Sequence, residues 1–214
     1  MINSLKWRLA QAAEWRWWKH YLKKKEKTAY LHQKKEYWYR VFKEVSAEIP
    51  QGETILDVGC GPAGIFMIFD ECEVDAIDPL VEVYQRELPH FSIADYSYVQ
   101  FINRPFEDVR VKKQYDWVFC LNVINHVRDI KQALRQLNKA VKPEKKLLLS
   151  VDAHNYSLLK HIFQWLPGDI LHPHQYSLDD YIAMLNSSGL QVAKVKKLKQ
   201  GLIFSYYLLL CNKA

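Results

Sequence analysis

The feature that most constrains this chain is the segment 53–64, in which a short apolar stretch runs directly into a glycine turn. Residues 55–58 are mostly branched and apolar, which is typical of a buried strand. Gly59 and Gly61 follow at once. Because glycine has no Cβ, the backbone can turn sharply there and a ligand can lie directly against it. The segment therefore predicts an α/β fold with a ligand site at the end of its first strand.

A second apolar strand, residues 73–78, ends in the acid Asp78, nineteen residues after Gly59. This layout is typical of a nucleoside-binding βαβ unit, in which the acid accepts hydrogen bonds from ribose hydroxyls. The alternative is that Asp78 caps the N-terminus of a helix, since Pro79 follows it. We favour the ribose role.

The glycine turn differs from the one that binds dinucleotides. Gly59, Gly61 and Gly64 have the spacing of that motif, but Asp57 precedes them and Pro62 follows the second glycine. Proline is tolerated in the first turn of a helix, where its missing N–H would be unpaired anyway. The helix expected after this turn therefore offers fewer N–H groups to a pyrophosphate.

Segment 57–64 resembles the first motif of class I S-adenosylmethionine (SAM) dependent methyltransferases, and the rest of the chain agrees with that family in order. The resemblance covers about residues 50–212, and within the family the chain is similar to the methyltransferase type 11 group. It implies a doubly wound, mostly parallel, Rossmann-like sheet of seven strands with an N-terminal helical extension. It also implies SAM as cofactor and S-adenosylhomocysteine as product. The segments that resemble the family's later strands are 98–102, 115–122, 147–152 and 202–210.

Length and composition fit this interpretation. A chain of 214 residues with 49% hydrophobic content suits one α/β domain with a single core. The four cysteines form no Cys-x-x-Cys pair, so we expect neither a zinc site nor a disulfide framework. No apolar run approaches the roughly 20 residues that span a bilayer. We therefore expect a soluble, cytoplasmic protein.

The first 45 residues differ from the rest. They carry twelve Lys or Arg against four Glu, although the whole chain is only +6. No proline or glycine interrupts them, so two helices separated near Thr28 are expected. We divide the chain into a basic, aromatic arm (1–48) and a SAM-binding domain (49–214) with a substrate-side insert (153–177). The arm contains Trp7, Trp15, Trp17, Trp18 and Trp38.

Three roles for the arm remain open. It could be a helical cap whose tryptophans pack on the sheet. It could be a lid, because methyl transfer needs a dry site and aromatic walls suit adenine and a sulfonium cation. It could also dock on an anionic membrane or on RNA, with Lys23–Lys27 supplying charge.

The resemblance assigns the cofactor residues by position. Glycine backbones should face the methionine and ribose, Asp57 should order the turn and receive the amino group through water, and Asp78 should hold the ribose. The family's usual acid near the adenine is absent before Phe106, so we expect Phe106 and Glu107 to replace it. The full predicted set is Asp57, Gly59, Cys60, Gly61, Asp78, Pro79, Phe106, Glu107 and Asn122.

Two histidines are the candidates for catalysis. His126 follows the fourth strand beside the expected pocket, and a histidine side chain titrates near neutral pH. Many relatives have Glu where this chain has Asn125, which disfavours a metal-assisted mechanism. His174 lies in the insert, where His172 and His174 flank a proline without a carboxylate partner. We predict no metal site there but a wall that contacts substrate, followed by a helix capped by Ser177. Local structural roles remain alternatives for both histidines.

The sequence thus predicts a methyltransferase that moves a methyl group from SAM to a small molecule by in-line displacement. Oxygen is the favoured acceptor atom, and nitrogen or sulfur are the alternatives. One alternative is a lipid, quinone or RNA methyltransferase that docks through the basic arm. Another is a SAM-binding protein without activity.

Overall fold

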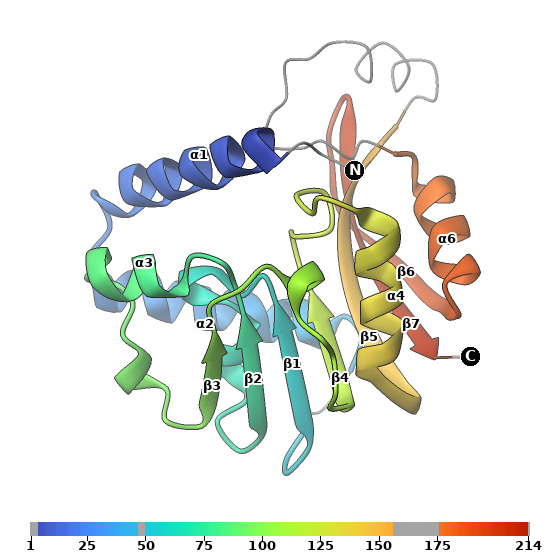
Figure 1. Ribbon diagram of the computed structural model, residues 1–214, viewed down its shortest axis with the longest axis horizontal. Helices are drawn as coiled ribbons and strands as arrows, with labels where there is room; N and C mark the ends of the chain where they lie inside the picture. Colours follow the sequence, from blue (N-terminus) through green and yellow to red (C-terminus); the bar gives the residue numbers. More distant parts are fainter. Residues whose placement is uncertain (1–3, 47–49, 156–175, 214) are drawn as a thin grey trace.

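The computed structural model describes residues 4–46, 50–155 and 176–213. Its centre is a seven-stranded sheet with the strand order β3-β2-β1-β4-β5-β7-β6 (Figure 1). The first five strands pair in parallel, and β7 runs antiparallel between β5 and β6. This confirms the predicted doubly wound sheet. The strands are β1 (Thr54–Val58), β2 (Glu73–Ile77), β3 (Val99–Ile102), β4 (Tyr115–Cys120), β5 (Val141–His154), β6 (Leu190–Gln200) and β7 (Phe204–Lys213).

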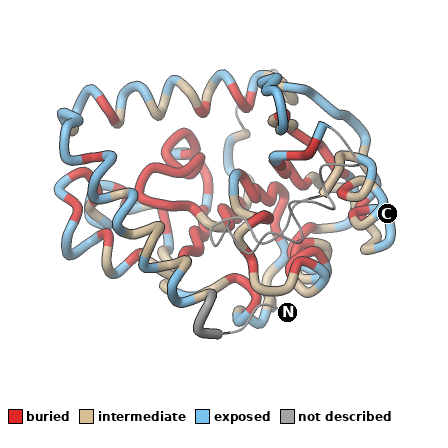
Figure 2. Tube along the Cα trace, turned by 90° about the horizontal axis from the view of Figure 1, so that it is seen from above, coloured by how far each residue is buried: buried red, intermediate tan, exposed pale blue. Residues whose placement is uncertain are grey.

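Helices cover both faces of the sheet. In Figure 1, α4 and α6 lie in front of the strands and α2 lies behind them, while α1 crosses above the ends of the parallel strands. Buried positions therefore run through the middle of the molecule, and exposed positions follow the outer turns of the helices (Figure 2). The helices are α1 (Ser4–Leu22), α2 (Lys27–Lys43), α3 (Val81–Glu87), α4 (Ile130–Ala140) and α6 (Leu178–Ser187).

The central strands are apolar on both sides because each face packs against helices. In β4, Trp117 and Phe119 belong to the core on the α2 side, whereas Val118 and Cys120 belong to the core on the α4 side. This explains why the strands appear in the sequence as continuous apolar runs rather than as an alternation.

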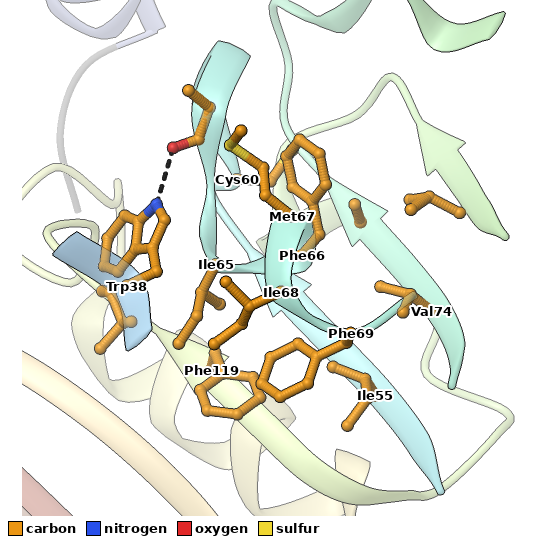
Figure 3. Packing of buried hydrophobic residues seen from close by; sticks show 14 of the residues in the cluster. Trp38, Ile55, Cys60, Ile65, Phe66, Met67, Ile68, Phe69, Val74 and Phe119 are labelled. Carbon is orange, nitrogen blue, oxygen red and sulfur yellow. Dashed lines mark hydrogen bonds between the residues drawn. The ribbon is translucent and has the colours of Figure 1, made fainter. Parts of the chain in front are cut away.

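The arm is part of the core on the α2 side. Phe42 contacts Phe69 and Trp117 with ring centroids 5.5 and 5.1 Å apart. One turn earlier, the indole Nε1 of Trp38 donates a hydrogen bond of 2.8 Å to the carbonyl of Ala63 (Figure 3). Burying such aromatic side chains stabilises a fold by roughly 1.5–3 kcal/mol each. Helix α2 therefore anchors the arm directly behind the glycine turn.

Local capping fixes where the helices begin. The Glu26 carboxylate accepts hydrogen bonds from the N–H groups of Thr28 and Ala29 and so caps the start of α2. The boundary between α1 and α2 therefore lies close to the predicted position near Thr28. Ser177 and Asp180 form a reciprocal capping box at the start of α6, which confirms the predicted cap.

The prediction of a helix directly after the glycine turn is wrong. Two short 3₁₀ turns, Gly61–Ala63 and Ile65–Ile68, take its place, separated by an extended Gly64. All four residues of the second turn are buried. A segment that is apolar on every side cannot form the half-exposed helix that usually follows the first strand.

Among the described helices, none combines the length and the apolar character that a membrane span requires.

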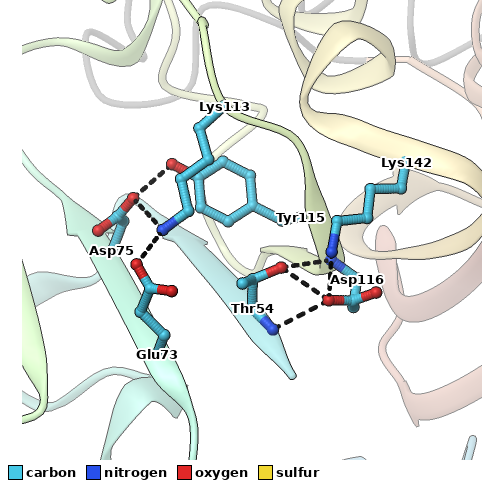
Figure 4. A network of polar contacts seen from close by, with 7 residues as sticks. All are labelled: Thr54, Glu73, Asp75, Lys113, Tyr115, Asp116 and Lys142. Carbon is cyan, nitrogen blue, oxygen red and sulfur yellow. Dashed lines mark hydrogen bonds and ion pairs between the residues drawn. The ribbon is translucent and has the colours of Figure 1, made fainter. Parts of the chain in front are cut away.

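A polar network ties together the starts of β1, β4 and β5, at the end of the sheet away from α1 (Figure 4). Asp116 accepts hydrogen bonds from the Thr54 N–H (3.0 Å) and hydroxyl (2.7 Å), and from the Lys142 Nζ (2.7 Å). The Lys145 Nζ lies 3.2 Å from its second oxygen. Burial alone would raise the pKa of Asp116, but these hydrogen bonds outweigh burial and hold that pKa below its ordinary value.

We expect Asp116→Asn to lower the free energy of unfolding at pH 7 by about 1–3 kcal/mol, because it leaves the half-buried Thr54 and two lysine ammonium groups without a charged acceptor. Since the folded pKa is lowered, this stabilisation is complete above about pH 4 and is lost as the pH falls further. Urea titrations of both proteins at pH 7 and at pH 3.5 measure the difference. Asp95→Asn, which removes an exposed ion pair with Lys27, is the control and should cost less than about 1 kcal/mol. Equal losses in the two variants would contradict a special role for the network.

Candidate functional site

A pocket opens at the ends of β1, β2 and β4, where the parallel strands point toward α1 (Figure 1). In doubly wound sheets this end is where ligands bind. The pocket brings together every predicted site residue that lies in the described part of the chain: Asp57, Gly59, Cys60, Gly61, Asp78, Pro79, Phe106, Glu107, Asn122 and His126.

The glycine turn forms the floor of this pocket. Gly59 and Gly61 have φ angles of +66° and +56°, which side chains rarely allow. A Cβ on Gly59 would lie 2.2 Å from the Val123 side chain, so packing also requires glycine there. A Cβ on Gly61 would meet only the Trp18 ring, at 3.5 Å. The Trp18 ring of α1 therefore lies directly over the backbone at Gly61.

Asp57 and Asp78 hold this turn from two sides. Asp57 accepts a hydrogen bond of 3.1 Å from the Phe66 N–H and thereby orders the backbone after the turn, as expected. Asp78 accepts from the N–H of Gly61 at 3.0 Å and from that of Leu80 at 2.8 Å. Burial raises the pKa of Asp57 to about 7 and that of Asp78 to about 6. Both carboxylates are thus buried, close to each other and exposed to the pocket rather than to bulk water.

The alternative role of Asp78 as a helix cap is wrong. Helix α3 begins only at Val81, and its cap residue is Leu80, without any side-chain cap. Asp78 instead joins β2 to the glycine turn.

The far wall comes from the 3₁₀ turn Phe106–Asp108. Phe106 presents an apolar surface, while the Glu107 carboxylate accepts a 2.7 Å hydrogen bond from the Arg128 N–H. The Arg128 guanidinium in turn lies 5.2 Å from the ring centroid of Trp7 on α1. Glu107 therefore connects the wall to the loop after β4, and Arg128 connects that loop to α1.

The loop after β4 contributes Asn122 and His126. Asn122 has a φ of +61°, a conformation that asparagine tolerates better than most residues, and its N–H donates to the Ser150 hydroxyl at 2.8 Å. His126 lines the pocket, half-buried. Asn125 faces elsewhere: its amide donates to the Asp152 carbonyl and accepts from the Tyr181 hydroxyl. Asn125 thus has a structural role.

The arm closes the pocket from above. Trp7, Gln11, Glu14 and Trp18 of α1 line it, which agrees with the lid interpretation. Burial, and to a smaller extent Asp78, raise the pKa of Glu14 to about 8. From α2, Lys34 enters the lining with its Nζ 5.5 Å from the Tyr37 ring centroid and 5.7 Å from that of Trp38, and burial lowers its pKa.

Glu14 and Lys34 were not among the site residues predicted from the sequence. One signal for Glu14 was present, because it is the only acid in residues 1–25. Lys34 had no such signal, since lysines are frequent throughout the arm.

His174 and the rest of segment 156–175 lie outside the described residues, so its predicted role stays a prediction. Within the described ranges, no three His, Cys, Asp or Glu side chains are grouped so that they could hold a metal ion.

A family model described as a methyltransferase domain matches residues 30–195. Ubiquinone biosynthesis O-methyltransferase of Rickettsia bellii (strain OSU 85-389) is 28% identical over 169 residues, which cover 71% of this chain and 65% of that relative. The protein of the same name from Rickettsia canadensis (strain McKiel) is 25% identical over 167 residues, covering 70% of this chain and 66% of its own. The chain thus spans slightly less than two thirds of the length of these relatives.

Solved structures share the fold. The YcgJ protein from Bacillus subtilis aligns with a TM-score of 0.66 at 15% identity, covering 84% of this chain and 99% of its own. The 1,6-didemethyltoxoflavin N1-methyltransferase of Burkholderia thailandensis was solved with bound 1,6-didemethyltoxoflavin and S-adenosylhomocysteine. It aligns with a TM-score of 0.64 at 11% identity, covering 100% of this chain and 92% of its own.

The family model spans most of the chain, and the sheet order, the glycine turn and the acid after β2 lie where the resemblance placed them. The chain therefore belongs to the methyltransferase domain family, with the fold of class I SAM-dependent methyltransferases.

Proposed function

We propose that this chain transfers the methyl group of SAM to an oxygen atom of a small-molecule acceptor. The observation that carries the proposal is the pocket itself, where a glycine turn and two buried carboxylates face an aromatic lid. The name of the Rickettsia relatives supports oxygen as the acceptor atom.

The residues fit the cofactor. Among the described residues only the Trp18 ring lies within 4 Å of a Cβ built on Gly61, so a ligand against this backbone would lie beside Trp18. Along its polar edge SAM presents hydrogen-bond donors: the ribose hydroxyls, the ammonium group and the adenine amino group. The pocket presents acceptors, Asp57 and Asp78, with the Phe106 ring at the adenine side. When bound, SAM supplies a methyl group already activated by its sulfonium.

The protein's own part is positioning and proton transfer. Asp78 would hold the ribose, and Asp57 would receive the ammonium group through water. Trp7 and Trp18 exclude bulk water from above. An acceptor hydroxyl must lose its proton during the reaction, and His126 is the residue we propose as the general base. Alignment of donor and acceptor supplies most of the remaining acceleration.

A membrane-associated acceptor of the quinone class is the second candidate. The outer side of α1 exposes Leu9 (52%), Trp17 (52%) and Tyr21 (37%), and the last two rings stack 4.9 Å apart. Exposed Arg8, Arg16 and Lys23 accompany them. A basic helix with exposed aromatic side chains suits an anionic bilayer surface. This reading also accords with the ubiquinone pathway in the names of the relatives.

The test is incubation of the purified protein and methyl-labelled SAM with fractionated cell extract. We expect label in the polar small-molecule fraction, bound to oxygen when the product is identified by mass spectrometry. Label confined to the lipid fraction would select the quinone-class candidate, and label in RNA would contradict both. Binding of SAM without transfer to any fraction would favour an inactive SAM-binding protein.

We expect Asp78→Asn to weaken SAM binding about 100-fold, because two hydrogen bonds to a charged acceptor contribute roughly 1.5 kcal/mol each or more. Asparagine keeps an acceptor for only one of the two backbone N–H groups, those of Gly61 and Leu80, that Asp78 binds, so a lower melting temperature should accompany the weaker binding. Isothermal titration calorimetry gives the affinity and circular dichroism the melting temperature. Asp70→Asn, at an exposed position, is the matched control. An unchanged affinity would show that Asp78 does not hold the cofactor.

We expect His126→Ala to lower kcat by about 10²-fold or more while the Kd for SAM stays within a factor of two or so, as loss of a general base requires. His32→Ala, an exposed histidine on α2, should leave kcat unchanged. If kcat of His126→Ala equals that of the wild type, the base is another group, and His174 is the next to test.

A further inference from the structure

Glu14 lies on the inner face of α1. Together with Trp7, Gln11 and Trp18 it follows the spacing of one helical face, and all four residues line the pocket. The outer turns of α1 are basic, and no other acid occurs before Glu26. The one carboxylate of this helix therefore points away from the solvent that would hydrate it and toward Asp78.

Burial and the nearby Asp78 raise the pKa of Glu14 to about 8. Ionising Glu14 at neutral pH therefore costs free energy unless a cation lies close to it. One turn before Glu14, the Oε1 atom of Gln11 is buried and has no hydrogen-bond donor among the described residues. Glu14 accepts a hydrogen bond from the Trp18 side chain, so of these two residues it is Gln11 whose oxygen has no donor among the described residues, although buried polar groups normally have one.

A ligand that suits this part of the pocket carries hydrogen-bond donors and a positive charge. The ribose hydroxyls of SAM are such donors, and its sulfonium adds the positive charge. S-adenosylhomocysteine has the same hydroxyls but lacks the sulfonium charge. A sulfonium beside Glu14 favours the ionised form of this carboxyl group, so Glu14 can distinguish the two molecules by Coulomb attraction.

We propose that Glu14 and Gln11 form the lid half of the cofactor site: they accept hydrogen bonds from the ribose hydroxyls opposite Asp78, and the charge of Glu14 makes the closed lid prefer SAM to S-adenosylhomocysteine. This inference rests on the proposed function. It gives α1 a role in turnover, because methyl transfer removes the charge that Glu14 attracts and so loosens the lid over the product.

Other contacts hold α1 in place without Glu14. Trp15 and Trp18 contact Tyr84 of α3 at 6.4 and 6.5 Å between ring centroids, and Lys19 pairs with Glu87 at 3.6 Å. The Trp7–Arg128 contact fixes the other end. The position of the helix and the charge of its carboxylate can therefore be tested separately.

The first test is Glu14→Gln, which removes the charge and keeps the shape. Calorimetric titration should show about tenfold weaker binding of SAM and a change of no more than about twofold for S-adenosylhomocysteine, since only the Coulomb attraction to the sulfonium is lost. The melting temperature without cofactor should stay level or rise, because the repulsion from Asp78 disappears. Glu36→Gln, an exposed position on α2, is the matched control and should change neither affinity.

An equal loss for both ligands, no loss for either, or a lowered melting temperature would overturn the proposal. If the wild type binds neither SAM nor S-adenosylhomocysteine, the proposed function itself fails. That result differs from one in which the wild type binds both and Glu14→Gln changes neither affinity.

The second test follows the lid directly. Lys23–Lys25 are exposed between α1 and α2, so trypsin can cut there. SAM should slow this cleavage in the wild type more than S-adenosylhomocysteine does. In Glu14→Gln the two should protect equally. Retention of the full difference in Glu14→Gln would overturn the role of this carboxylate.

Discussion

The site depends on two buried carboxylates that bind the backbone of one turn. Asp57 accepts the N–H of Phe66, and Asp78 accepts those of Gly61 and Leu80. Each carboxylate is desolvated by this arrangement, which raises both pKa values. The hydrogen bonds from the backbone offset part of that cost and fix where the oxygens lie. The same two groups thus shape the glycine turn and leave a negative potential above it, so the fold and the ligand preference have one physical origin.

The rest of the molecule keeps this turn rigid and dry. Behind it, Trp38 donates to the Ala63 carbonyl within the aromatic core of α2. Beside it, the Val123 side chain occupies the space that any Cβ on Gly59 would need. The turn therefore cannot change conformation without disturbing two packed elements, and a preorganised site of this kind favours binding because little is reordered when the ligand arrives.

How far the sequence predicts this structure depends on which interactions are local. The strands could be predicted, because a sheet buried on both faces needs apolar runs and the glycine turn marks the first of them. The doubly wound arrangement was implied by the family resemblance. The Ser177 cap is local too, and it was confirmed. The helix after the turn was wrong because Ile65–Ile68 is buried on every side by tertiary contacts, which no local pattern reports. The cap role of Asp78 failed because α3 begins only at Val81, and the Asp78 carboxylate binds the N–H of Gly61, seventeen residues away, as well as that of Leu80.

The lid residues show most clearly what a one-dimensional pattern leaves out. The basic, aromatic character of the arm suggested several roles, and composition alone did not separate them. In the structure α1 has two environments: an outer side with cations and exposed aromatic rings, and an inner side with two indoles, an amide and one carboxylate. A solvated helix would tolerate acids anywhere, so a single acid among many bases carries information only once its direction is known. Glu14 points at Asp78, and a pocket that holds two acids against each other is complementary to a cation. Charge complementarity of this kind belongs to the folded arrangement of α1 over β2 and cannot be read from either segment alone.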